Sequence, residues 1–327
     1  MHRKRILCLL LLASMLLCGC GRQPVTAAEL RAASAGLPVI GLFSKGKGGK
    51  DETQDENFVP YQAPPYHSSL FHEGAAQGNE QVKLDLSSIA DGYIAISVKS
   101  EKRLKFQVLK DDQTYNYDLA SDGTPSVFPL QCGDGNYRFR VMENVAESKY
   151  AEIYSAEAAV KLNDEFQPFL RPSDYVNYNE NSACVKKAAE LAAKTGDALG
   201  VVSKVYEYVC SQVKYDRQKA ATVQSGYLPD PDETMSSGKG ICFDYASLAA
   251  AMLRSQGIPT KEVFGYVSPD GLYHAWNMFY TEQTGWVSVS FEVSQNDWNR
   301  MDLTFSANGA DASFIGDGSN YKDMYFY

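Results

Sequence analysis

Two residues in the C-terminal half of the chain, Cys242 and His274, have side chains suited to nucleophilic catalysis. Cys242 begins an apolar segment with helical spacing, which Gly257 and Pro259 close as a C-terminal glycine and a following proline do. At the first turn of a helix, unpaired N–H groups and the helix dipole lower the pKa of a thiol. The pattern therefore predicts a helix with a reactive thiol at its start, although a packed core cysteine fits Cys242 taken alone.

The distribution of histidines favours a pairing with Cys242. The chain has 4 His, and the other three, His2, His67 and His72, lie in the N-terminal 72 residues. His274 opens a predicted strand, residues 274–280, in which alternate residues share a face. A histidine beside a cysteine activates the thiol at neutral pH, and a third group then orients the imidazole. We expect His274 to be the general base for Cys242.

The elements before this pair indicate a helical hairpin. Residues 182–195 and 199–213 carry apolar side chains at helical spacing, with a break at Gly196-Asp197. Cys184 and Cys210 are each thirteen residues from Asp197, so antiparallel helices would place them at the same level. A disulfide requires Cα atoms within ~7 Å, and two buried free thiols fit the pattern equally well.

Acidic residues around the predicted helix receive structural interpretations. Asp244 lies in the first turn after Cys242, where its charge would oppose thiolate formation, and it is assigned no catalytic role. Asp230 and Asp232 flank Pro231 in a predicted loop at the rim of the cleft.

Residues 79–162 have a different period. Apolar and polar residues alternate in about seven short runs that are separated by turn signals such as Asp91-Gly92 and Asp122-Gly123. This spacing is typical of an antiparallel β-sandwich of immunoglobulin-like type. No catalytic constellation occurs in these residues, and their aspartates and glycines are those of turns.

The N-terminus resembles the lipoprotein signal of bacteria. A basic stretch, Arg3-Lys4-Arg5, precedes an apolar run at residues 6–17, which is shorter than the ~20 residues of a membrane span. The run ends in Leu17-Cys18-Gly19-Cys20, which is similar to a lipobox. The resemblance implies that residues 1–19 are removed, that Cys20 becomes lipidated, and that the protein is anchored on the extracellular face of the cell membrane.

Residues 20–78 are predicted to form a flexible tether between the lipid and the folded part. The stretch Ser44–Asn57 contains no apolar residue and several glycines, so it cannot contribute to a core. A tether of this composition would hold a domain away from the membrane surface.

Charge and motif content narrow the classes of partner. The chain carries 31 Lys+Arg against 40 Asp+Glu, a net charge of −9, which argues against nucleic acid as a partner because such binding neutralises phosphates with basic residues. The acidic residues Asp311, Asp317 and Asp323 do not follow the calcium-binding loop with its terminal glutamate. We therefore expect neither a metal nor another cofactor, and nothing in the sequence indicates an oligomeric state.

Several motifs together resemble the transglutaminase-like superfamily of papain-type cysteine enzymes over residues 163–327. They are Gly240-Ile241-Cys242 at the head of a helix, His274-Ala275-Trp276 at the start of a strand, Trp286, and Asp302-Leu303-Thr304-Phe305. The resemblance implies an α+β domain with a Cys242–His274–Asp302 triad. In this triad Cys242 forms an acyl-thioester and Asp302 orients His274.

The third member of the triad departs from the family pattern. In the family a tryptophan-led strand ends in Val-Asp-Pro-Thr, whereas Trp286-Val-Ser-Val-Ser290 has a serine at the position of the aspartate. Asp302 is preferred because it keeps tryptophan, carboxylate, threonine and aromatic residue in order. A hairpin insertion at residues 287–297 would then account for the extra length.

The sequence thus predicts a lipid-anchored α+β protein with four parts: signal peptide 1–19, tether 20–78, β-sandwich 79–162 and transglutaminase-like domain 163–327. Its expected substrates are amide groups of proteins or peptides. Amine acceptors would give crosslinking, and water would give hydrolysis. The alternative is a binding or scaffold module that retains the fold without catalysis, and a cell-wall peptidase with a Cys–His pair is a third interpretation.

Overall fold

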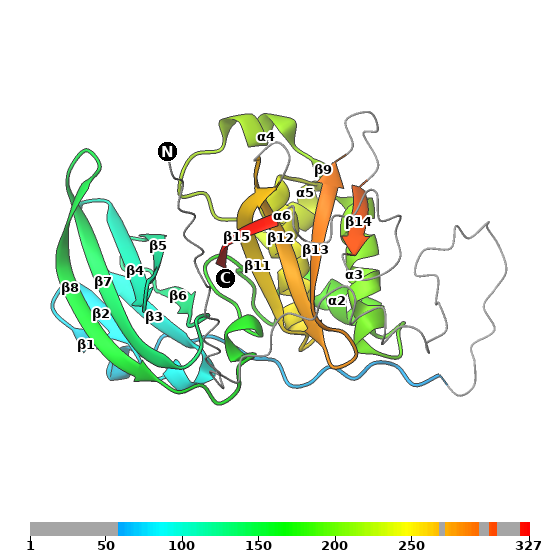
Figure 1. Ribbon diagram of the computed structural model, residues 1–327, viewed down its shortest axis with the longest axis horizontal. Coiled ribbons are helices and arrows are strands. Elements are labelled where there is room, and N and C mark those ends of the chain that lie inside the picture. Colours follow the sequence, from blue (N-terminus) through cyan, green and yellow to red (C-terminus); the bar gives the residue numbers. More distant parts are fainter. Residues whose placement is uncertain (1–57, 268–271, 294–300, 306–320) are drawn as a thin grey trace, which may run out of the picture. The chain divides into compact units, whose positions relative to one another are not determined.

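The computed structural model describes residues 58–267, 272–293, 301–305 and 321–327 (Figure 1). The signal peptide with Cys20, and the tether up to residue 57, lie outside these ranges. Within them the chain is α+β, with antiparallel sheets in the N-terminal half and helices packed on a further sheet in the C-terminal half. The predicted fold class is confirmed, while the immunoglobulin-like topology stays a prediction.

The N-terminal half consists of two four-stranded sheets. One has the order β1-β2-β3-β6 and the other the order β5-β4-β7-β8, and all pairs are antiparallel. Apolar side chains of both sheets, among them Ile94, Phe106 and Phe139, share one buried cluster. The strands are β1 (Gln77–Gly78), β2 (Val82–Asp85), β3 (Tyr93–Val98), β4 (Leu104–Lys110), β5 (Gln113–Leu119), β6 (Ser126–Pro129), β7 (Gly135–Ala146) and β8 (Lys149–Val160).

Residues 58–78, which the sequence assigned to the tether, pack against the folded part. The Tyr61 hydroxyl donates to the Gln256 carbonyl at 2.9 Å, and the Tyr61 N–H donates to the Thr195 carbonyl at 2.7 Å. The segment continues through a short 3-10 helix, η1 (Glu73–Ala75), into β1. The boundary of the tether was therefore placed too late, because tyrosines and prolines that look like linker residues form specific contacts.

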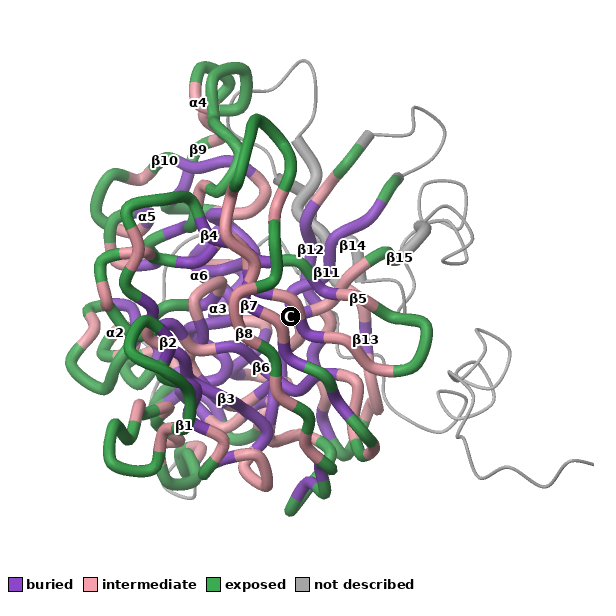
Figure 2. The backbone as a smooth tube through the Cα atoms, turned by 90° about the vertical axis from the view of Figure 1, so that its left-hand side faces the viewer, coloured by how far each residue is buried: buried purple, intermediate pink, exposed green. Residues whose placement is uncertain are grey.

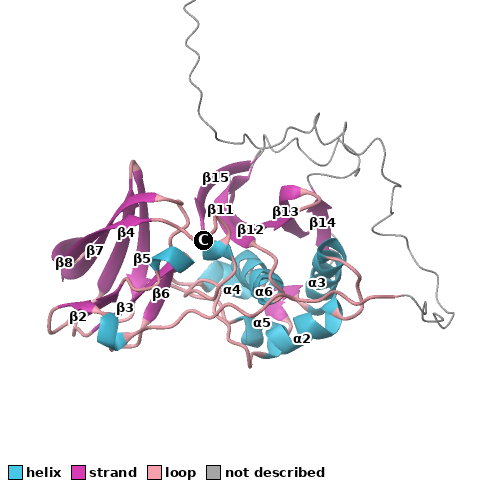
Figure 3. Cartoon of the chain, turned by 90° about the horizontal axis from the view of Figure 1, so that it is seen from below, coloured by secondary structure: helices cyan, strands magenta, loops and turns pink. Residues whose placement is uncertain are grey.

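The C-terminal half places helices against a five-stranded antiparallel sheet of order β14-β13-β12-β11-β15 (Figure 3). Its strands are β11 (Thr260–Val267), β12 (Leu272–Thr281), β13 (Gly285–Val293), β14 (Met301–Phe305) and β15 (Tyr321–Phe326). The helices are α2 (Ala183–Ala192), α3 (Ala198–Gln212), α4 (Arg217–Thr222), α5 (Pro231–Ser237) and α6 (Cys242–Ser255). A two-stranded parallel sheet joins β9 (Lys214–Tyr215) to β10 (Lys239–Gly240), and the remaining 3-10 helices are η2 (Ile89–Asp91) and η3 (Gln167–Phe169).

Helix α6 is the centre of the C-terminal core. Almost every residue from Asp244 to Ser255 is buried, and Figure 2 shows the helix as buried along most of its length. The small side chains Ala249, Ala250 and Ala251 allow α2, α3 and the sheet to approach it closely. The helix begins at Cys242, as predicted, so this packing fixes the position of the cysteine.

The helical hairpin predicted before α6 is also confirmed. Asp197 caps α3 by accepting the Gly200 N–H at 2.7 Å, which explains why the chain breaks between α2 and α3.

Gly257 follows the C-terminal end of α6. It has a φ of 73°, and a Cβ there would also meet the Pro64 ring. The glycine thus ends the helix and admits the N-terminal segment.

Candidate active site

Cys242 is the first residue of α6, directly after the N-cap residue Ile241. The Asp244 side chain accepts the Ile241 N–H at 2.7 Å, so the first turn is closed by a carboxylate from inside the helix. Cys242 itself is partly buried and packs with Phe243 against the aromatic side of the N-terminal core. The thiol is therefore held on a rigid element rather than on a loop.

The sulfur of Cys242 lies beside strand β12. The backbone N–H of Ala275 and that of Phe243 donate to it, and both contacts lower the pKa of the thiol. Ala275 directly follows His274, so the structure brings the cysteine next to the backbone of the residue that follows the histidine. The sequence predicted these two elements and their proximity.

The expected acidity of the thiol is not what the structure gives. Burial is the largest influence on the pKa of Cys242 and raises it, and the charge of the Asp244 carboxylate raises it further. These effects exceed those of the two N–H donors. The prediction that the helix N-terminus lowers the thiol pKa was wrong, because the first turn is buried and carries an acid.

His274 lies near the start of β12, where it is paired with Gly265 of β11 and partly buried. The strand begins at Leu272, two residues earlier than predicted. Three residues after the histidine, the buried Asn277 amide donates to the Ala246 carbonyl in α6 at 3.0 Å. This bond fixes the strand of the histidine against the helix of the cysteine.

The third position of the triad can be described by its backbone only, because the side chains of Asp302 and Ser290 lie outside the described residues. Ser290 is on β13, the strand next to β12, and it is paired with Thr304 of β14. Asp302 is on β14, which β13 separates from β12. Strand β14 is two strand spacings, ~10 Å, from β12, the strand of His274, whereas β13 with Ser290 is one spacing away. The assignment of Asp302 as the third member of the triad stays a prediction.

The hairpin insertion proposed for residues 287–297 can be described only in its first part. Strand β13 runs unbroken from Gly285 to Val293 and pairs with both of its neighbours. Its antiparallel register with β14 places Glu292 opposite Asp302. Residues 294–297 lie outside the described residues, so the insertion stays a prediction.

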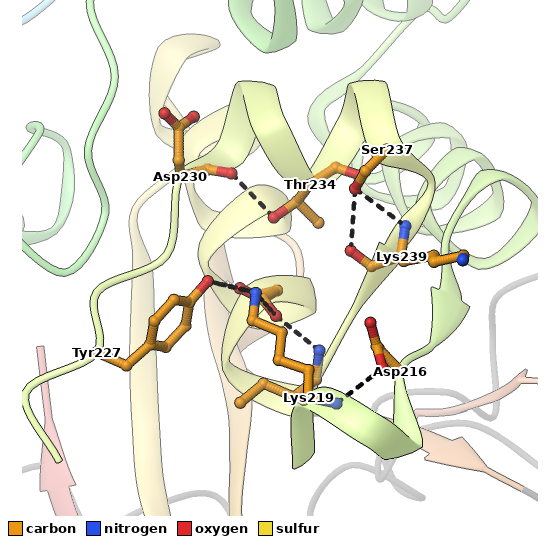
Figure 4. A network of polar contacts seen from close by, with 9 residues as sticks. Asp216, Lys219, Tyr227, Asp230, Thr234, Ser237 and Lys239 are labelled. Carbon is orange, nitrogen blue, oxygen red and sulfur yellow. Dashed lines mark hydrogen bonds and ion pairs between the residues drawn. The ribbon is translucent and has the colours of Figure 1, made fainter. Parts of the chain in front are cut away.

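A buried carboxylate beside Cys242 is the part of the site that the sequence left without a role. Asp244 is 0% exposed, and the Lys219 ammonium lies 3.0 Å from its Oδ1 and 2.9 Å from its Oδ2. The Tyr227 hydroxyl also bonds Oδ1, and Figure 4 shows the side chains of Lys219 and Tyr227 pointing toward each other. Lys219 and Tyr227 lie on the segment between β9 and α5, whose sequence carried no signal of this contact.

The other two aspartates are structural. Asp230 accepts the N–H groups of Asp232 and Glu233 and so caps α5, which begins at Pro231. The carboxylate of Asp232 accepts the N–H groups of Ala183 and Cys184 at 2.8 Å and caps α2. Asp232 thus joins α5 to α2, and Asp230 begins α5. The prediction that both lie in a loop at the rim of the cleft was wrong.

The cysteines of the described residues are all unbridged: Cys132, Cys184, Cys210 and Cys242. Burial raises the pKa of Cys184, with the Asp232 carboxylate adding to the effect. This environment leaves Cys184 as an unreactive thiol.

The described part of the chain contains no cluster of three or more metal-binding side chains. None of its helices has the length and hydropathy that a membrane span requires.

Comparison with known proteins gives the family of the C-terminal half. Residues 185–291 match the model of the transglutaminase-like superfamily. An uncharacterized protein of Mycobacterium leprae is 29% identical over 133 residues, which are 38% of this chain and 44% of that protein. A UPF0252 protein of Methanocaldococcus jannaschii is 30% identical over 77 residues, 22% of each chain, so this chain spans less than half the length of either relative.

A solved structure gives a weaker likeness. A candidate cysteine protease from Cytophaga hutchinsonii shares 16% identity at a TM-score of 0.36, over 71% of this chain and 80% of that one. The matched residues 185–291 include both Cys242 and His274. The chain therefore carries a domain of the transglutaminase-like superfamily.

Proposed function

We propose that the protein is a cysteine acyltransferase or hydrolase that acts on amide groups of proteins or peptides through a thioester on Cys242. One observation carries the proposal: the sulfur at the start of α6 accepts the N–H of Ala275, next to His274. A buried core cysteine would not need a strand that carries a histidine at this level beside it. The match of residues 185–291 to the transglutaminase-like model supports the same reading.

In the first step His274 accepts the proton of the Cys242 thiol, and the sulfur attacks the carbonyl carbon of the substrate amide. The C–N bond then breaks, and the leaving amine takes the proton from His274. In the second step an amine or water attacks the thioester and loses its proton to His274. The C–S bond then breaks, and the sulfur takes that proton from His274 to become the thiol again. An amine acceptor gives a new amide and water gives an acid, so the acceptor decides between crosslinking and hydrolysis.

The raised pKa of the thiol sets the role of the base. Because burial disfavours the thiolate, Cys242 rests as a neutral thiol and depends on proton transfer to His274 at the moment of attack. A group that orients the imidazole would support this transfer. Asp302 is our assignment for that group, with Ser290 as the alternative.

We further propose that the enzyme works outside the cell, anchored through a lipid on Cys20. The supporting observation is the order of the basic stretch, the apolar run and Gly19-Cys20 in the sequence. Substrates would then be proteins or peptides at or beyond the membrane surface.

The test of the catalytic proposal compares Cys242→Ala with Cys210→Ala, a second partly buried cysteine of the same domain. Incorporation of a fluorescent primary amine into casein reports transfer, and release of peptides from the same substrate reports hydrolysis. We expect Cys242→Ala to lose all activity and Cys210→Ala to retain it, with equal thermal stability. Activity that survives in Cys242→Ala would refute the nucleophile, and a folded wild type that is inactive and whose Cys242 shows no enhanced reactivity would favour the binding-module alternative.

A further inference from the structure

The partly buried side chains of Lys219 and Tyr227 meet the fully buried carboxylate of Asp244 behind the first turn of α6. The Asp244 carboxylate receives three donors, the Lys219 ammonium, the Tyr227 hydroxyl and the Ile241 N–H. We call these three side chains the Asp244 cluster.

The contacts that position the cluster run from β10, just before Cys242, through β9 and α4 to Asp244, just after Cys242. Strand β10, which leads into α6, pairs in parallel with β9, and the Asp216 N–H donates to the Gly240 carbonyl at 2.8 Å. Asp216 then caps α4 by accepting the Lys219 N–H at 2.8 Å. The Lys219 side chain extends from this first turn to Asp244. The segment of residues 214–219 is therefore joined to the segment around Cys242 at two places, by the pairing of β9 with β10 and by the Lys219–Asp244 contact.

The close packing of the turn shows how little freedom it has. A Cβ on Gly240 would lie 2.6 Å from the Cβ of Asp244, a distance that forces a shift. The Lys219 ammonium lies 4.3 Å from the centre of the Tyr227 ring, and the same ring meets Phe243 edge-on with centroids 6.2 Å apart. Phe243 is the residue whose N–H donates to the Cys242 sulfur.

The charge of Asp244 makes the cluster more than a helix cap. A capping carboxylate at an exposed helix start is solvated by water, whereas Asp244 is 0% exposed and two residues from the reacting sulfur. A negative charge at this place opposes the thiolate. Lys219 supplies the opposite charge at hydrogen-bond distance from both carboxylate oxygens.

We infer that Asp244, Lys219 and Tyr227 are positioning residues that fix the Cys242 turn and cancel the charge of Asp244 beside the sulfur. This inference rests on the proposed function of Cys242 as nucleophile. It assigns to Lys219 a specific task, which is to keep a buried acid from suppressing ionisation of the thiol. Asp244 then caps the helix, and Lys219 neutralises the charge that this cap places beside the sulfur.

Lys219 and Asp244 should shift the midpoint pH of Cys242 alkylation in opposite directions. Lys219→Met leaves an uncompensated carboxylate near the sulfur, and Asp244→Asn leaves an uncompensated ammonium. The first should move the midpoint of Cys242 alkylation to higher pH by about one pH unit, and the second should move it to lower pH. Lys219→Arg keeps the charge and should restore the wild-type midpoint.

The experiment measures the pH dependence of alkylation by iodoacetamide in the full-length protein in detergent, with Cys242 followed by peptide mass mapping. Lys204→Met is the matched control, because it removes a lysine from an exposed pair with Glu207 on α3. Tyr227→Phe is a milder variant that keeps the ion pair and should give a smaller upward shift than Lys219→Met. It provides the readout if Lys219→Met does not fold.

Opposite shifts in Lys219→Met and Asp244→Asn, with rescue by Lys219→Arg, would establish the inference. Shifts of the same sign, or loss of stability with an unchanged midpoint, would overturn it and leave the cluster a structural cap. The measurement needs no turnover. A wild-type midpoint that does not depend on His274 would count against the proposed function alone, while the differences among the cluster variants would still decide the inference.

Discussion

The side chain of Asn277 joins the strand of His274 to the helix of Cys242. Its amide nitrogen donates to the Ala246 carbonyl at 3.0 Å, and its oxygen accepts the Tyr206 hydroxyl at 3.2 Å, all within the buried core. Three elements, β12, α6 and α3, therefore meet at one polar residue. The spacing of Cys242 and His274, the proposed catalytic pair, depends on this bridge as well as on apolar packing.

Asn277→Ala should destabilise the fold and impair the site together. It leaves the Tyr206 hydroxyl buried without this acceptor, at a cost of about 1–3 kcal/mol. We expect a lower midpoint in urea unfolding and a lower rate of Cys242 alkylation at pH 7. Asn116→Ala is the control, because that side chain bonds Gln107 on an exposed sheet face and should change stability by less than about 0.5 kcal/mol. Equal effects of the two changes would contradict the bridging role.

His274→Ala should expose the intrinsic acidity of the thiol. Burial raises the pKa of Cys242, so without its base the cysteine should react only as the pH rises above the ordinary value of a free thiol, ~8.5. The wild type should be alkylated at lower pH than the variant, as read by peptide mass mapping. Cys132, whose pKa burial also raises, is an internal reference that should not change. Superimposed wild-type and variant profiles would remove His274 from the mechanism.

The third position of the triad can be decided by two substitutions. If Asp302 orients the imidazole, Asp302→Asn should reduce kcat by on the order of 10²–10⁴, whereas Ser290→Ala should have little effect. Rates of amine incorporation and of peptide release, each divided by the content of titratable Cys242, give the comparison. The reverse ranking would assign the role to β13, the strand adjacent to β12.

The parts of the site that the sequence predicted are those set by local pattern. Helical spacing and a closing glycine located α6 and hence Cys242, and strand alternation located His274. The acidity of the thiol was not predictable in this way, because it depends on how deeply the first turn is buried and on contacts with another element, β12. Strand order is equally non-local: nothing in the spacing of Ser290 and Asp302 shows that β13 lies between β12 and β14.

The end of the tether was missed for a related reason. Pro64 and Tyr61 carry no periodic signal, yet Pro64 fills the space that Gly257 leaves open, and Tyr61 bonds the C-terminal end of α6. A sequence reads such residues as linker because their contacts are made with residues almost two hundred positions away. The fold class was predictable, whereas the packing of individual loop residues was not.

Gly240→Ala tests the tight approach of β10 to the Cys242 turn. The added Cβ would lie 2.6 Å from Asp244, so the turn or the carboxylate must move. Overpacking of this kind costs about 1–3 kcal/mol, and we expect a lower melting temperature together with slower alkylation of Cys242. Gly74→Ala is the matched control, since nothing lies within 4 Å of a Cβ there. A Gly240→Ala protein that melts and reacts like the wild type would show that the turn tolerates displacement.

The buried acid of β11 gives a prediction about pH and stability. Glu262 is 0% exposed, and neither carboxyl oxygen has a hydrogen-bond partner among the described residues. Burial raises its pKa well above the ordinary value, although the nearby Arg254 guanidinium opposes this effect. The guanidinium is engaged by three backbone carbonyls, those of Thr260, Arg171 and Tyr327, so we expect the neutral carboxyl in the folded protein.

The sign of the linkage follows from the raised pKa. The contribution of Glu262 to stability is fully present below its unfolded pKa of ~4.3 and declines as the pH rises toward its folded pKa. Glu262→Gln stays neutral at every pH, so its free energy of unfolding should equal that of the wild type near pH 4 and exceed it by at least about 1 kcal/mol at pH 7. Urea unfolding at the two pH values measures the difference. Glu152→Gln is the control of opposite sign, since the Ser155 and Arg140 side chains hold the pKa of that exposed carboxyl below its ordinary value. A wild type more stable than Glu262→Gln at pH 7 would instead mean that Glu262 is ionised and paired electrostatically with Arg254.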